Sequence, residues 1–428
     1  MNYEETLNKI HTLNKFGSRP GLDRILMLLE MMGNPQDSLR FVHVAGTNGK
    51  GSVCQMLSSV LSVSGYRTGL FISPYITDFR ERIQLDNEPI SKEDLCETAE
   101  YVFSLVEKLN ARDIIITEFE FVMAVSFEYF RRQNADVVVC ETGLGGLLDC
   151  TNVIKPPLCA VLTKIGFDHT NILGGTLTDI ATQKCGIIKI GSSVVSDLQR
   201  EEAKAVIDST CENLNVPLIF ARGKNIEVIS SNLTGTEFTY KDKKYKITLL
   251  GEHQTQNAAV AIETVNVLRE KGYDISEENL LVGLAQAKNP ARQEIMREKP
   301  LILLDGAHNA DGMSTFAKGI RALCKDKKPL LIMGMLADKD SKASLEYIKG
   351  EFQQVFTVPI NNPRAMKSQD MAKLCEEYFD SVKAFQSLRE ALYEALRISE
   401  KEERPVAICG SLYLAGEIRP LILDYLKQ

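Results

Sequence analysis

The stretch Phe41–Val53 constrains the fold more than any other part of the chain. It begins with a short apolar run typical of a β-strand, continues through a glycine-rich turn, and leads into apolar residues spaced as on one face of an amphipathic helix. A strand that feeds a glycine turn and then a helix directs backbone N–H groups and the positive end of the helix dipole toward one point, which suits a phosphate group. Lys50 adds the positive charge that terminal phosphates need. The stretch therefore predicts a phosphate-binding loop.

The match to the general phosphate-loop pattern, G-x-x-x-x-G-K-[ST], is imperfect. Val44 occupies the position of the first glycine, and Gly51 separates Lys50 from Ser52. The alternative is an ordinary tight turn between a strand and a helix. The strand before the turn and the helix after it favour phosphate binding.

The size and composition of the chain indicate the broad class of protein. A chain of 428 residues is too long for one ordinary hydrophobic core, so we expect two domains. Its 44% hydrophobic and 25% charged residues are typical of a soluble globular protein, and its net charge of −7 argues against nucleic acid as a partner. Because the sequence lacks an uninterrupted apolar stretch of about 20 residues, we expect no membrane-spanning helix.

The cysteines and the first residues of the chain indicate its compartment. The ten cysteines are scattered singly and form no C-x-x-C pair, and Cys140, Cys159 and Cys409 lie in apolar runs. This distribution is typical of reduced, buried thiols rather than of disulfides. The chain begins with acidic residues and without the apolar core of a signal peptide. Together these features predict a cytoplasmic protein.

Polar residues follow three further apolar runs of strand type in the first part of the chain. They are Ser73, Glu141 and His169, the last of which stands beside Asp168. In open α/β sheets the residues at the strand ends face the ligand crevice, and a carboxylate there is a common Mg²⁺ ligand of nucleotide enzymes. The three residues are therefore candidate metal ligands. The alternative is a turn serine and a strand-terminal glutamate without a metal.

Lys184 and Arg82 are basic residues whose surroundings allow two interpretations. Lys184 lies beside the apolar segment Gly186–Ile188. If the lysine is buried, its pKa falls and its amine becomes reactive; the alternative is a lysine whose amine reaches water while its stem lies along an apolar surface. Arg82 lies in the polar segment Asp78–Gln84, which either clamps an anionic aromatic substrate or forms a surface hairpin.

The segment Gln286–Arg292 contains a proline and separates two patterned regions, so we place the domain boundary there. Before it, the pattern predicts helices at residues 91–110 and 118–133 and β-hairpins within residues 226–250. Beyond it the alternation of strand and helix starts again, with apolar strands at residues 301–304, 329–333, 355–358 and 405–409. We therefore predict an α/β protein of two domains. A P-loop-containing domain with a mostly parallel sheet occupies residues 1–290, and a smaller Rossmann-like α/β domain occupies residues 291–428.

Taken together, the motifs of this chain resemble those of the Mur ligase superfamily, and specifically those of the folylpolyglutamate synthases and dihydrofolate synthases. The resemblance covers nearly the whole chain, and the occurrence of the motifs in this order makes it specific. The motifs are His43–Ser52, Ser73–Pro74, Glu141–Gly146 with Asp149–Asn152, Asp168–His169, Lys184–Lys189, Asp305–Asn309 and Gly410–Tyr413.

This resemblance implies ATP-dependent formation of an amide bond between a folate-type carboxylate and the amine of L-glutamate. The γ-phosphoryl group would first pass to the carboxylate to give an acyl phosphate, which the amine then attacks. The implied partners are small molecules, namely ATP, a folate and L-glutamate, with Mg²⁺ as the metal cofactor. We expect a monomer.

The resemblance also implies roles for individual residues. The residues that would bind ATP are Thr47, Asn48, Gly49, Lys50, Gly51, Ser52, Asn257, Arg292 and Asp305. Ser73, Glu141 and His169 would hold Mg²⁺, and Lys184 matches the lysine that is carbamylated in this family. The residues that would take part in catalysis are Lys50, Lys184, His169 and His308. Substrate contacts would come from Asp23, Arg82, Phe119, Glu120, Asp149 and Ser411.

The chain departs from the family pattern at a few positions. Gln183 and Cys185 flank Lys184 where an acidic and a small residue are usual. Leu147 stands where the family has an arginine, and Tyr75 where a histidine is common. These positions belong neither to the phosphate loop nor to the expected metal ligands. They leave open whether dihydropteroate is accepted as well as reduced folates.

Two other functions are alternatives. A ligase acting on a cell-wall precursor would also contain Asp168–His169 and Lys184–Gly186, whereas Ser73–Pro74 and Arg80–Arg82 favour folate. A P-loop ATPase acting as a switch would hydrolyse ATP without forming an amide. That function would leave the second domain's motif Asp305–Asn309 without a role.

Overall fold

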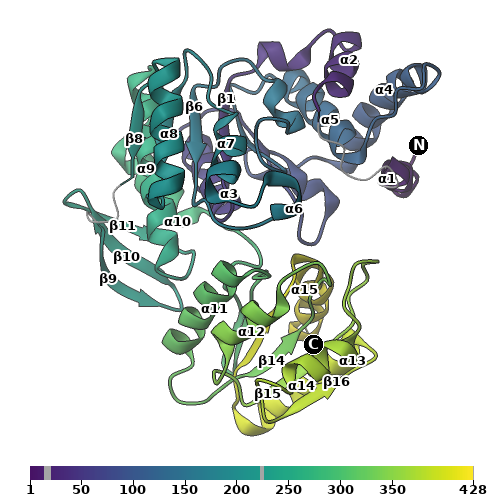
Figure 1. Cartoon of the computed structure of the whole chain (residues 1–428), viewed down its shortest axis with the longest axis vertical. Coiled ribbons are helices and arrows are strands. Elements are labelled where there is room, and N and C mark those ends of the chain that lie inside the picture. The colour runs from purple at the N-terminus through teal and green to yellow at the C-terminus, as the bar shows by residue number, and fades with distance from the viewer. Residues whose placement is uncertain (14–20, 222–225, 428) are drawn as a thin grey trace. The chain divides into compact units, whose positions relative to one another are not determined.

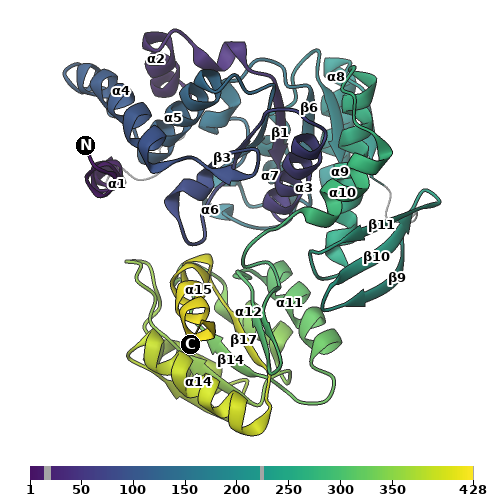
Figure 2. The same ribbon diagram turned by 180° about the vertical axis from the view of Figure 1, so that it is seen from behind.

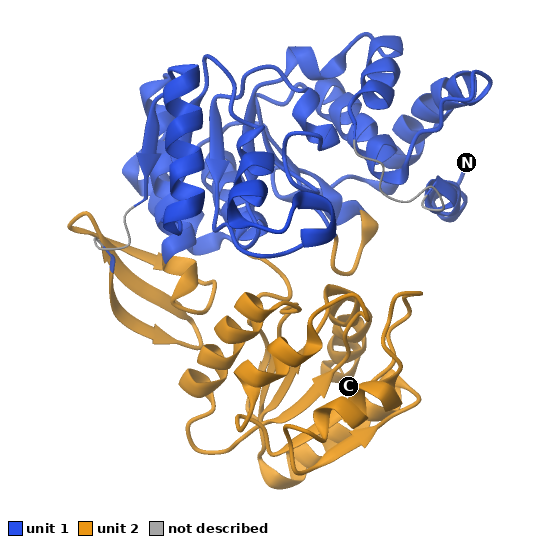
Figure 3. Cartoon of the chain, viewed as in Figure 1, with its two compact units in different colours: residues 1–74, 80–226, 256–287 blue, residues 75–79, 227–255, 288–428 orange. Residues whose placement is uncertain are grey.

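The computed structural model of the chain describes residues 1–13, 21–221 and 226–427. These residues group into two compact units (Figure 3). The first unit contains residues 1–74, 80–226 and 256–287, and the second contains residues 75–79, 227–255 and 288–428.

The first unit is built on a sheet of eight strands, in the order β4-β3-β2-β5-β1-β6-β7-β8. The strands from β2 to β8 in this order run parallel, and β3 and β4 add an antiparallel edge beside β2. The bounds are β1 (Phe41–Ala45), β2 (Thr68–Phe71), β3 (Ile83–Leu85), β4 (Glu88–Pro89), β5 (Val137–Glu141), β6 (Cys159–Leu162), β7 (Ser193–Ser196) and β8 (Leu218–Phe220).

Helices cover both faces of this sheet, which explains why its central strands are apolar throughout. Every residue of β1, β2, β5 and β6 is buried. Helices α7 and α8 lie over one face (Figure 1), and α3 and α10 lie over the opposite face (Figure 2). The α-helices are α1 (Tyr3–Thr12), α2 (Asp23–Met31), α3 (Lys50–Val63), α4 (Lys92–Asn110), α5 (Glu118–Arg132), α6 (Thr170–Leu173), α7 (Leu177–Cys185), α8 (Glu201–Leu214), α9 (His253–Glu270) and α10 (Glu277–Gln286). The first three residues of α9 group with the second unit. Among the described residues, the 3₁₀ helices are η2 (Pro35–Ser38), η3 (Phe79–Arg82) and η4 (Cys150–Val153).

Helix α3, which follows the predicted phosphate loop, is buried along most of its length. It packs closely against α10, where the Ser59 hydroxyl donates a 2.7 Å hydrogen bond to the carbonyl oxygen of Gly283. A Cβ on Gly283 would lie 2.5 Å from the Cα of Val60, so only glycine allows this approach. The helix that presents the loop is therefore fixed between the sheet and α10.

A small antiparallel sheet of three strands, in the order β11-β10-β9, precedes α9. Its strands are β9 (Ile226–Asn232), β10 (Gly235–Tyr240) and β11 (Lys243–Ile247), so the predicted β-hairpins within residues 226–250 are confirmed. Lys241 and Asp242 join β10 to β11 with φ of 49° and 65°, the left-handed conformation of a tight hairpin turn.

The second unit contains a sheet of six strands, in the order β12-β13-β17-β14-β15-β16. Only β12 is antiparallel to its neighbour among the described pairs. The strands are β12 (Glu294–Glu298), β13 (Leu301–Leu304), β14 (Leu330–Met333), β15 (Gln354–Thr357), β16 (Val382–Ala384) and β17 (Val406–Cys409). The helices are α11 (Ala310–Leu323), α12 (Ser341–Ile348), α13 (Ser368–Cys375), α14 (Leu388–Glu402) and α15 (Leu412–Leu426).

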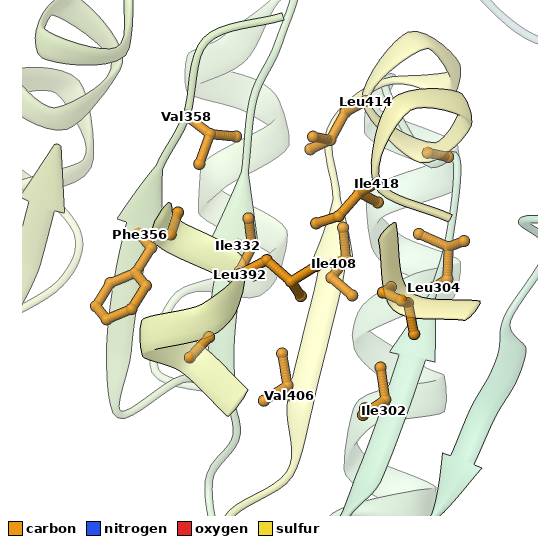
Figure 4. Close-up of a cluster of buried hydrophobic side chains, with 14 of the residues drawn as sticks. Ile302, Leu304, Ile332, Phe356, Val358, Leu392, Val406, Ile408, Leu414 and Ile418 are labelled. Atoms are coloured by element: carbon orange, nitrogen blue, oxygen red, sulfur yellow. The ribbon is translucent and has the colours of Figure 1, made fainter. Parts of the chain in front are cut away.

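Two hydrophobic clusters, one on each face of this sheet, form the core of the second unit. Ile302 and Leu304 of β13 belong to the cluster under α14 and α15, which Figure 4 shows. Leu303, between them, belongs to the other cluster, which includes residues of α11, α12 and α13. This alternation follows from the two-residue period of a strand, and it requires apolar residues at every position of β13.

The predicted α/β class, with a mostly parallel sheet followed by a smaller α/β sheet, is confirmed. The predicted helices at residues 91–110 and 118–133 correspond to α4 and α5. The boundary at residues 290 and 291 stays a prediction, and the compact units differ from it because residues 75–79 and 227–255 group with the second unit. In the part of the chain that the structure describes, no helix is long and apolar enough to cross a membrane.

Candidate active site

The glycine-rich turn joins β1 to α3 and is held in place from outside. Gly49 is the N-cap of α3 with φ of 90°, a conformation that glycine adopts without strain. A Cβ on Gly49 would lie 2.5 Å from Oδ1 of Asn257, so the Asn257 side chain lies directly against the turn. The N–H groups of Thr47 and Asn48 donate to the carbonyl oxygen of Lys164 at 2.8 and 3.2 Å. The N-terminus of α3 is thus a preformed site for an anion.

Lys50 and Glu141 lie together beside this turn. The Nζ of Lys50 donates to the carbonyl oxygens of Gly46 and Thr47 at 3.1 and 3.3 Å, and it lies 3.9 Å from Oε1 of Glu141. Glu141 is only 5% exposed, and its Oε2 accepts a 3.4 Å hydrogen bond from the N–H of Ser73. The arrangement places a cation and a buried carboxylate beside the N-terminus of α3.

The parallel register of the sheet explains why these residues meet. Strands β2, β5 and β1 are neighbours, with Val44 opposite Glu141 and Phe71 opposite Cys140. The carboxyl ends of parallel strands lie at the same edge of a sheet, so the residue types predicted at those ends are brought together.

The residues at this edge fit a magnesium ion that is completed by phosphate and water. Glu141 offers a carboxylate, and Ser73 and Ser52 offer hydroxyl groups, all of them oxygen donors of the kind Mg²⁺ prefers. Among the described residues, no group of three or more His, Cys, Asp and Glu side chains is placed to hold a metal.

Lys184 reaches the same turn from α7. Its Nζ donates a 2.8 Å hydrogen bond to the carbonyl oxygen of Gly46, and the side chain is 3% exposed. Burial, and after it the charge of Lys50, lowers the pKa of Lys184 to about 7. The structure thus shows a buried lysine rather than one whose amine reaches water, and its reactivity stays a prediction.

His169 lies on an exposed turn. It is the N-cap of α6, with φ of 49°, and its Nε2 is 3.9 Å from Oδ1 of Asp168. The imidazole is exposed, with the Asp168 carboxylate beside it. Its role as a metal ligand stays a prediction.

Asp149, predicted to contact substrate, shapes the loop that follows Glu141. Its Oδ2 accepts a 2.7 Å hydrogen bond from the N–H of Leu144, and its Oδ1 accepts from the N–H and hydroxyl of Thr151 at 3.0 and 2.6 Å. Burial raises the pKa of Asp149, and these hydrogen bonds oppose the rise. Both carboxylate oxygens are therefore occupied within the chain.

Glu120 is likewise engaged inside the protein. It closes the capping box of α5 by accepting from the N–H and hydroxyl of Thr117, each at 2.8 Å. Its Oε1 also lies 2.9 Å from Nη2 of Arg24, which follows the predicted substrate residue Asp23 in α2. The sequence pattern does not reveal that Arg24 pairs with Glu120, because the two residues lie 96 positions apart.

Phe119 belongs to α5, and Arg82 lies near the first residue of that helix, Glu118. The Phe119 ring covers Gly143, where a Cβ would lie 2.4 Å from Cζ of the ring. The Arg82 Nη2 lies 3.9 Å from Oε1 of Glu118, and the Arg82 side chain is 12% exposed. The polar segment around Arg82 forms η3 and the start of β3, and its residues 79–84 are buried or half-buried. The predicted contacts of both residues with substrate stay predictions.

In the second unit, Asp305 and His308 follow β13, and Arg292, which precedes β12, lies against the same turn. The Asp305 carboxylate accepts hydrogen bonds from the N–H groups of Gln293 and Ala307 at 3.0 and 2.6 Å. Burial raises the pKa of Asp305 to about 6, against the opposing effect of Arg292. Nδ1 of His308 lies 2.8 Å from the carbonyl oxygen of Gly306. Ser411, further along, is the N-cap of α15.

Comparison with known proteins identifies the class to which this fold and these residues belong. Residues 44–265 match the Mur ligase middle domain, and residues 291–412 match the glutamate ligase domain of the Mur ligases. The chain therefore belongs to the Mur ligase family of ATP-dependent ligases, and within it to the group of folylpolyglutamate synthases and dihydrofolate synthases. The family identification made from the sequence motifs is confirmed.

Individual relatives share nearly the full length of the chain. A folylpolyglutamate synthase of Lacticaseibacillus casei is 37% identical over 99% of both chains. A dihydrofolate synthase/folylpolyglutamate synthase of Bacillus subtilis is 34% identical over 97% of this chain and 98% of its own. The solved structure of a Mycobacterium tuberculosis folylpolyglutamate synthase complexed with ADP and AMPPCP has a TM-score of 0.90 at 29% identity, covering 98% of this chain and 99% of its own.

Proposed function

We propose that this chain joins L-glutamate to the carboxylate of a folate in a reaction driven by ATP. The observation that carries the proposal is the convergence of Lys50, Glu141 and Lys184 on the turn that opens α3. Full-length similarity to folylpolyglutamate synthases supports folate and L-glutamate as the substrates.

The chemistry of amide formation explains the need for this turn. A carboxylate is a poor electrophile, so the γ-phosphoryl group of ATP is first transferred to it, which gives an acyl phosphate and ADP. The amine of L-glutamate then attacks the acyl carbon, a proton leaves the nitrogen, and inorganic phosphate departs. Negative charge is concentrated on phosphate oxygens during phosphoryl transfer, and Lys50 together with the N–H groups of the α3 N-terminus stabilises that charge.

Mg²⁺ is proposed as the metal cofactor, held by Ser73, Glu141 and His169, with the Ser52 hydroxyl as a further oxygen ligand. When bound, the ion would neutralise charge on the β- and γ-phosphates. The buried carboxylate of Glu141, already hydrogen-bonded to the Ser73 backbone, supports this assignment.

The family resemblance implies that Lys184 is carbamylated, and its surroundings support the proposal. Carbamylation requires an unprotonated amine, and a pKa near 7 provides a substantial unprotonated fraction at neutral pH. Addition of the amine to carbon dioxide forms an N–C bond and releases a proton, which converts a buried cation into an anion. That anion would be a second carboxylate-like ligand beside the phosphate turn.

The remaining predicted residues are assigned to nucleotide and substrate binding. Thr47, Asn48, Gly49, Gly51, Asn257, Arg292 and Asp305 are proposed to bind ATP, with His308 acting in catalysis beside them. Phe119, Arg82, Asp23 and Ser411 are proposed to contact substrate. Glu120 and Asp149 are proposed to support substrate binding indirectly, because their oxygens already bind within the chain. Glu120 holds the N-terminus of α5, and Asp149 holds the loop after Glu141.

We further propose a cytoplasmic monomer whose partners are small molecules, without nucleic-acid or membrane partners.

A product assay tests the function. The protein is incubated with ATP, Mg²⁺ and L-glutamate, together with tetrahydrofolate, dihydropteroate or a muramyl peptide, and the products are measured by mass spectrometry and phosphate release. We expect glutamylated tetrahydrofolate, and the dihydropteroate arm decides whether the chain is also a dihydrofolate synthase. Product with the muramyl peptide alone would indicate a cell-wall ligase, and ATP hydrolysis independent of L-glutamate would indicate a switch ATPase.

The Lys50→Ala variant tests the phosphate turn within the same assay. We expect turnover to fall by roughly a hundredfold to a thousandfold, because a charge that stabilises the transition state is removed. Lys342→Ala removes an equally long but 67% exposed side chain of the second unit and should leave turnover unchanged. Equal activities of the two variants would show that Lys50 does not bind the transferred phosphate.

A further inference from the structure

Arg292 stands between two residues whose backbones are in the left-handed conformation. Ala291 has φ of 54° and Gln293 has φ of 48°. Residues other than glycine adopt this conformation at a cost, and they keep it only where the surrounding structure holds them. Such positions concentrate at functional sites, so the contacts that hold these two residues are informative.

The turn after β13 holds the segment from one side. The N–H of Gln293 donates to Oδ2 of Asp305 at 3.0 Å, and the N–H of Gly306 donates to the carbonyl oxygen of Ala291 at 2.8 Å. A Cβ on Gly306 would lie 2.9 Å from Nη1 of Arg292, so the guanidinium group lies over this glycine. Both the backbone and the side chain of Arg292 are thus fixed against the turn.

Glu294 and Arg419 hold the segment from the other side. Oε2 of Glu294 accepts a 2.9 Å hydrogen bond from the N–H of Ala291. The same carboxylate is bound by Arg419 of α15, whose Nε lies 3.1 and 3.0 Å from the two oxygens and whose Nη2 lies 2.8 Å from Oε1. Both side chains are less than a quarter exposed. A forked ion pair of this kind fixes the direction of a carboxylate as well as its charge.

The charge of Arg419 has a second consequence for Arg292. Glu294 lies two residues from Arg292, and without a partner its carboxylate would attract the Arg292 guanidinium. Arg419 neutralises that carboxylate, so Glu294 competes less for the Arg292 guanidinium, which also lies near the buried Asp305 carboxylate. A guanidinium group held in one orientation suits the paired oxygens of a phosphate.

We propose that Glu294 and Arg419 form a positioning pair that presets Arg292 for the phosphates of ATP. This inference rests on the proposed function of Arg292 as a nucleotide-binding residue. Neither Glu294 nor Arg419 contacts the nucleotide in this assignment; the pair acts through the backbone of Ala291 and through the balance of charge around Arg292.

A double-mutant cycle on the full chain tests the proposal. Dissociation constants of the ATP analogue AMPPCP are measured by titration calorimetry for the wild type, Arg292→Ala, Arg419→Ala and the double variant. We expect binding about tenfold weaker for Arg419→Ala and at least as weak for Arg292→Ala, with no further loss in the double variant, because coupled residues are not additive. Steady-state kinetics should show a raised KM for ATP and an unchanged KM for L-glutamate in Arg419→Ala.

Matched variants separate positioning from general destabilisation. Arg397 and Glu394 of α14 form an ion pair of similar forked geometry on the surface, with distances of 2.9 and 2.9 Å. Arg397→Ala should therefore leave AMPPCP binding unchanged. If Arg419→Ala fails to fold, Arg419→Lys and Glu294→Gln replace it in the cycle; Arg419→Lys keeps the charge without the fork and should weaken binding less than tenfold.

Each outcome of the cycle has a definite meaning. Full additivity of Arg419→Ala and Arg292→Ala, or unchanged binding in Arg419→Ala while Arg292→Ala binds weakly, would overturn the positioning pair and leave the role of Arg292 intact. Unchanged binding in Arg292→Ala would remove the role of Arg292 itself, and the positioning pair with it. In that case glutamate ligation in the product assay would show that the proposed reaction still stands.

Discussion

At the residue scale, Lys184, proposed above as a catalytic residue, carries a cost in stability. Its amine is buried, and its pKa falls from 10.5 to about 7. Between these two pH values the unfolded chain binds a proton that the folded chain does not, so the free energy of unfolding of the wild type rises with pH across this window. Below pH 7 both states bind the proton and the full penalty is present, about 5 kcal/mol.

Lys184→Met is therefore expected to stabilise the protein at pH 6.5 by a few kcal/mol and by much less at pH 9.5, while it abolishes ligation. Methionine has a similar length and carries no charge to desolvate. Urea unfolding at the two pH values, in buffer free of bicarbonate so that the amine is not carbamylated, checks the expectation. Lys349→Met, which changes an exposed lysine, is the control and should alter stability little at either pH. A gain of equal size at both pH values would mean that the Lys184 amine is not desolvated.

The sequence predicted some of the residues that meet at the phosphate turn, and physical reasons explain which ones. Lys50 and Glu141 follow from local patterns, since each stands directly after a buried strand or its turn, and parallel strands bring such ends together. Thr151 binds Asp149 locally, two residues further along the chain, whereas the Arg24 partner of Glu120 could not be predicted, because the two residues meet through tertiary packing across 96 positions. The same holds for Arg419, which lies 125 residues from Glu294.

At the scale of elements, the central strands of both sheets were predicted and several peripheral ones were not. Strands such as β1, β5 and β13 are buried on both faces, which produces continuous apolar runs. The strands that we did not predict include β7, β8, β12 and β16. Of these, β8, β12 and β16 are partly exposed along their length, and β8 and β16 have three residues each, so neither alternation nor an apolar run marks them.

The contact between α3 and α10 leads to a prediction about packing. In a helix, Gly→Ala usually stabilises a protein by up to about 1 kcal/mol. For Gly283→Ala we expect the opposite sign, a loss of about 3 kcal/mol, because the new Cβ would lie 2.5 Å from the backbone of Val60 and would push the two helices apart. Since α3 carries the phosphate turn at its N-terminus, ATP affinity should fall as well.

Chemical denaturation and AMPPCP titration of Gly283→Ala measure both effects. Gly175→Ala is the matched control, because a Cβ there would meet nothing within 4 Å and the backbone does not need glycine. A neutral or stabilising effect of Gly283→Ala, like that expected of the control, would contradict the close approach of the two helices.

At the scale of the whole molecule, the restart of the strand and helix alternation after residue 292 predicted a second α/β sheet. What the sequence could not reveal is that residues 75–79 and 227–255 group with this second unit, because a pattern along the chain does not record contacts between distant segments. The ligase activity follows from the combination of both units' motifs in a single chain, as the full-length similarity to known ligases indicates.

The second unit contains a complete core of its own, so we expect residues 288–428 to fold in isolation. Both hydrophobic clusters of its six-stranded sheet draw their buried residues from positions 291–422 alone. The order of the strands offers a control: β17 lies between β13 and β14, so a fragment of residues 288–404 lacks a central strand as well as α15. Circular dichroism and urea unfolding should show native-like secondary structure and one cooperative transition for 288–428, and neither for 288–404. A fragment 288–428 that unfolds without cooperativity would mean that its core depends on the segments contributed from earlier in the chain, such as Ile76, which packs against one of the two clusters.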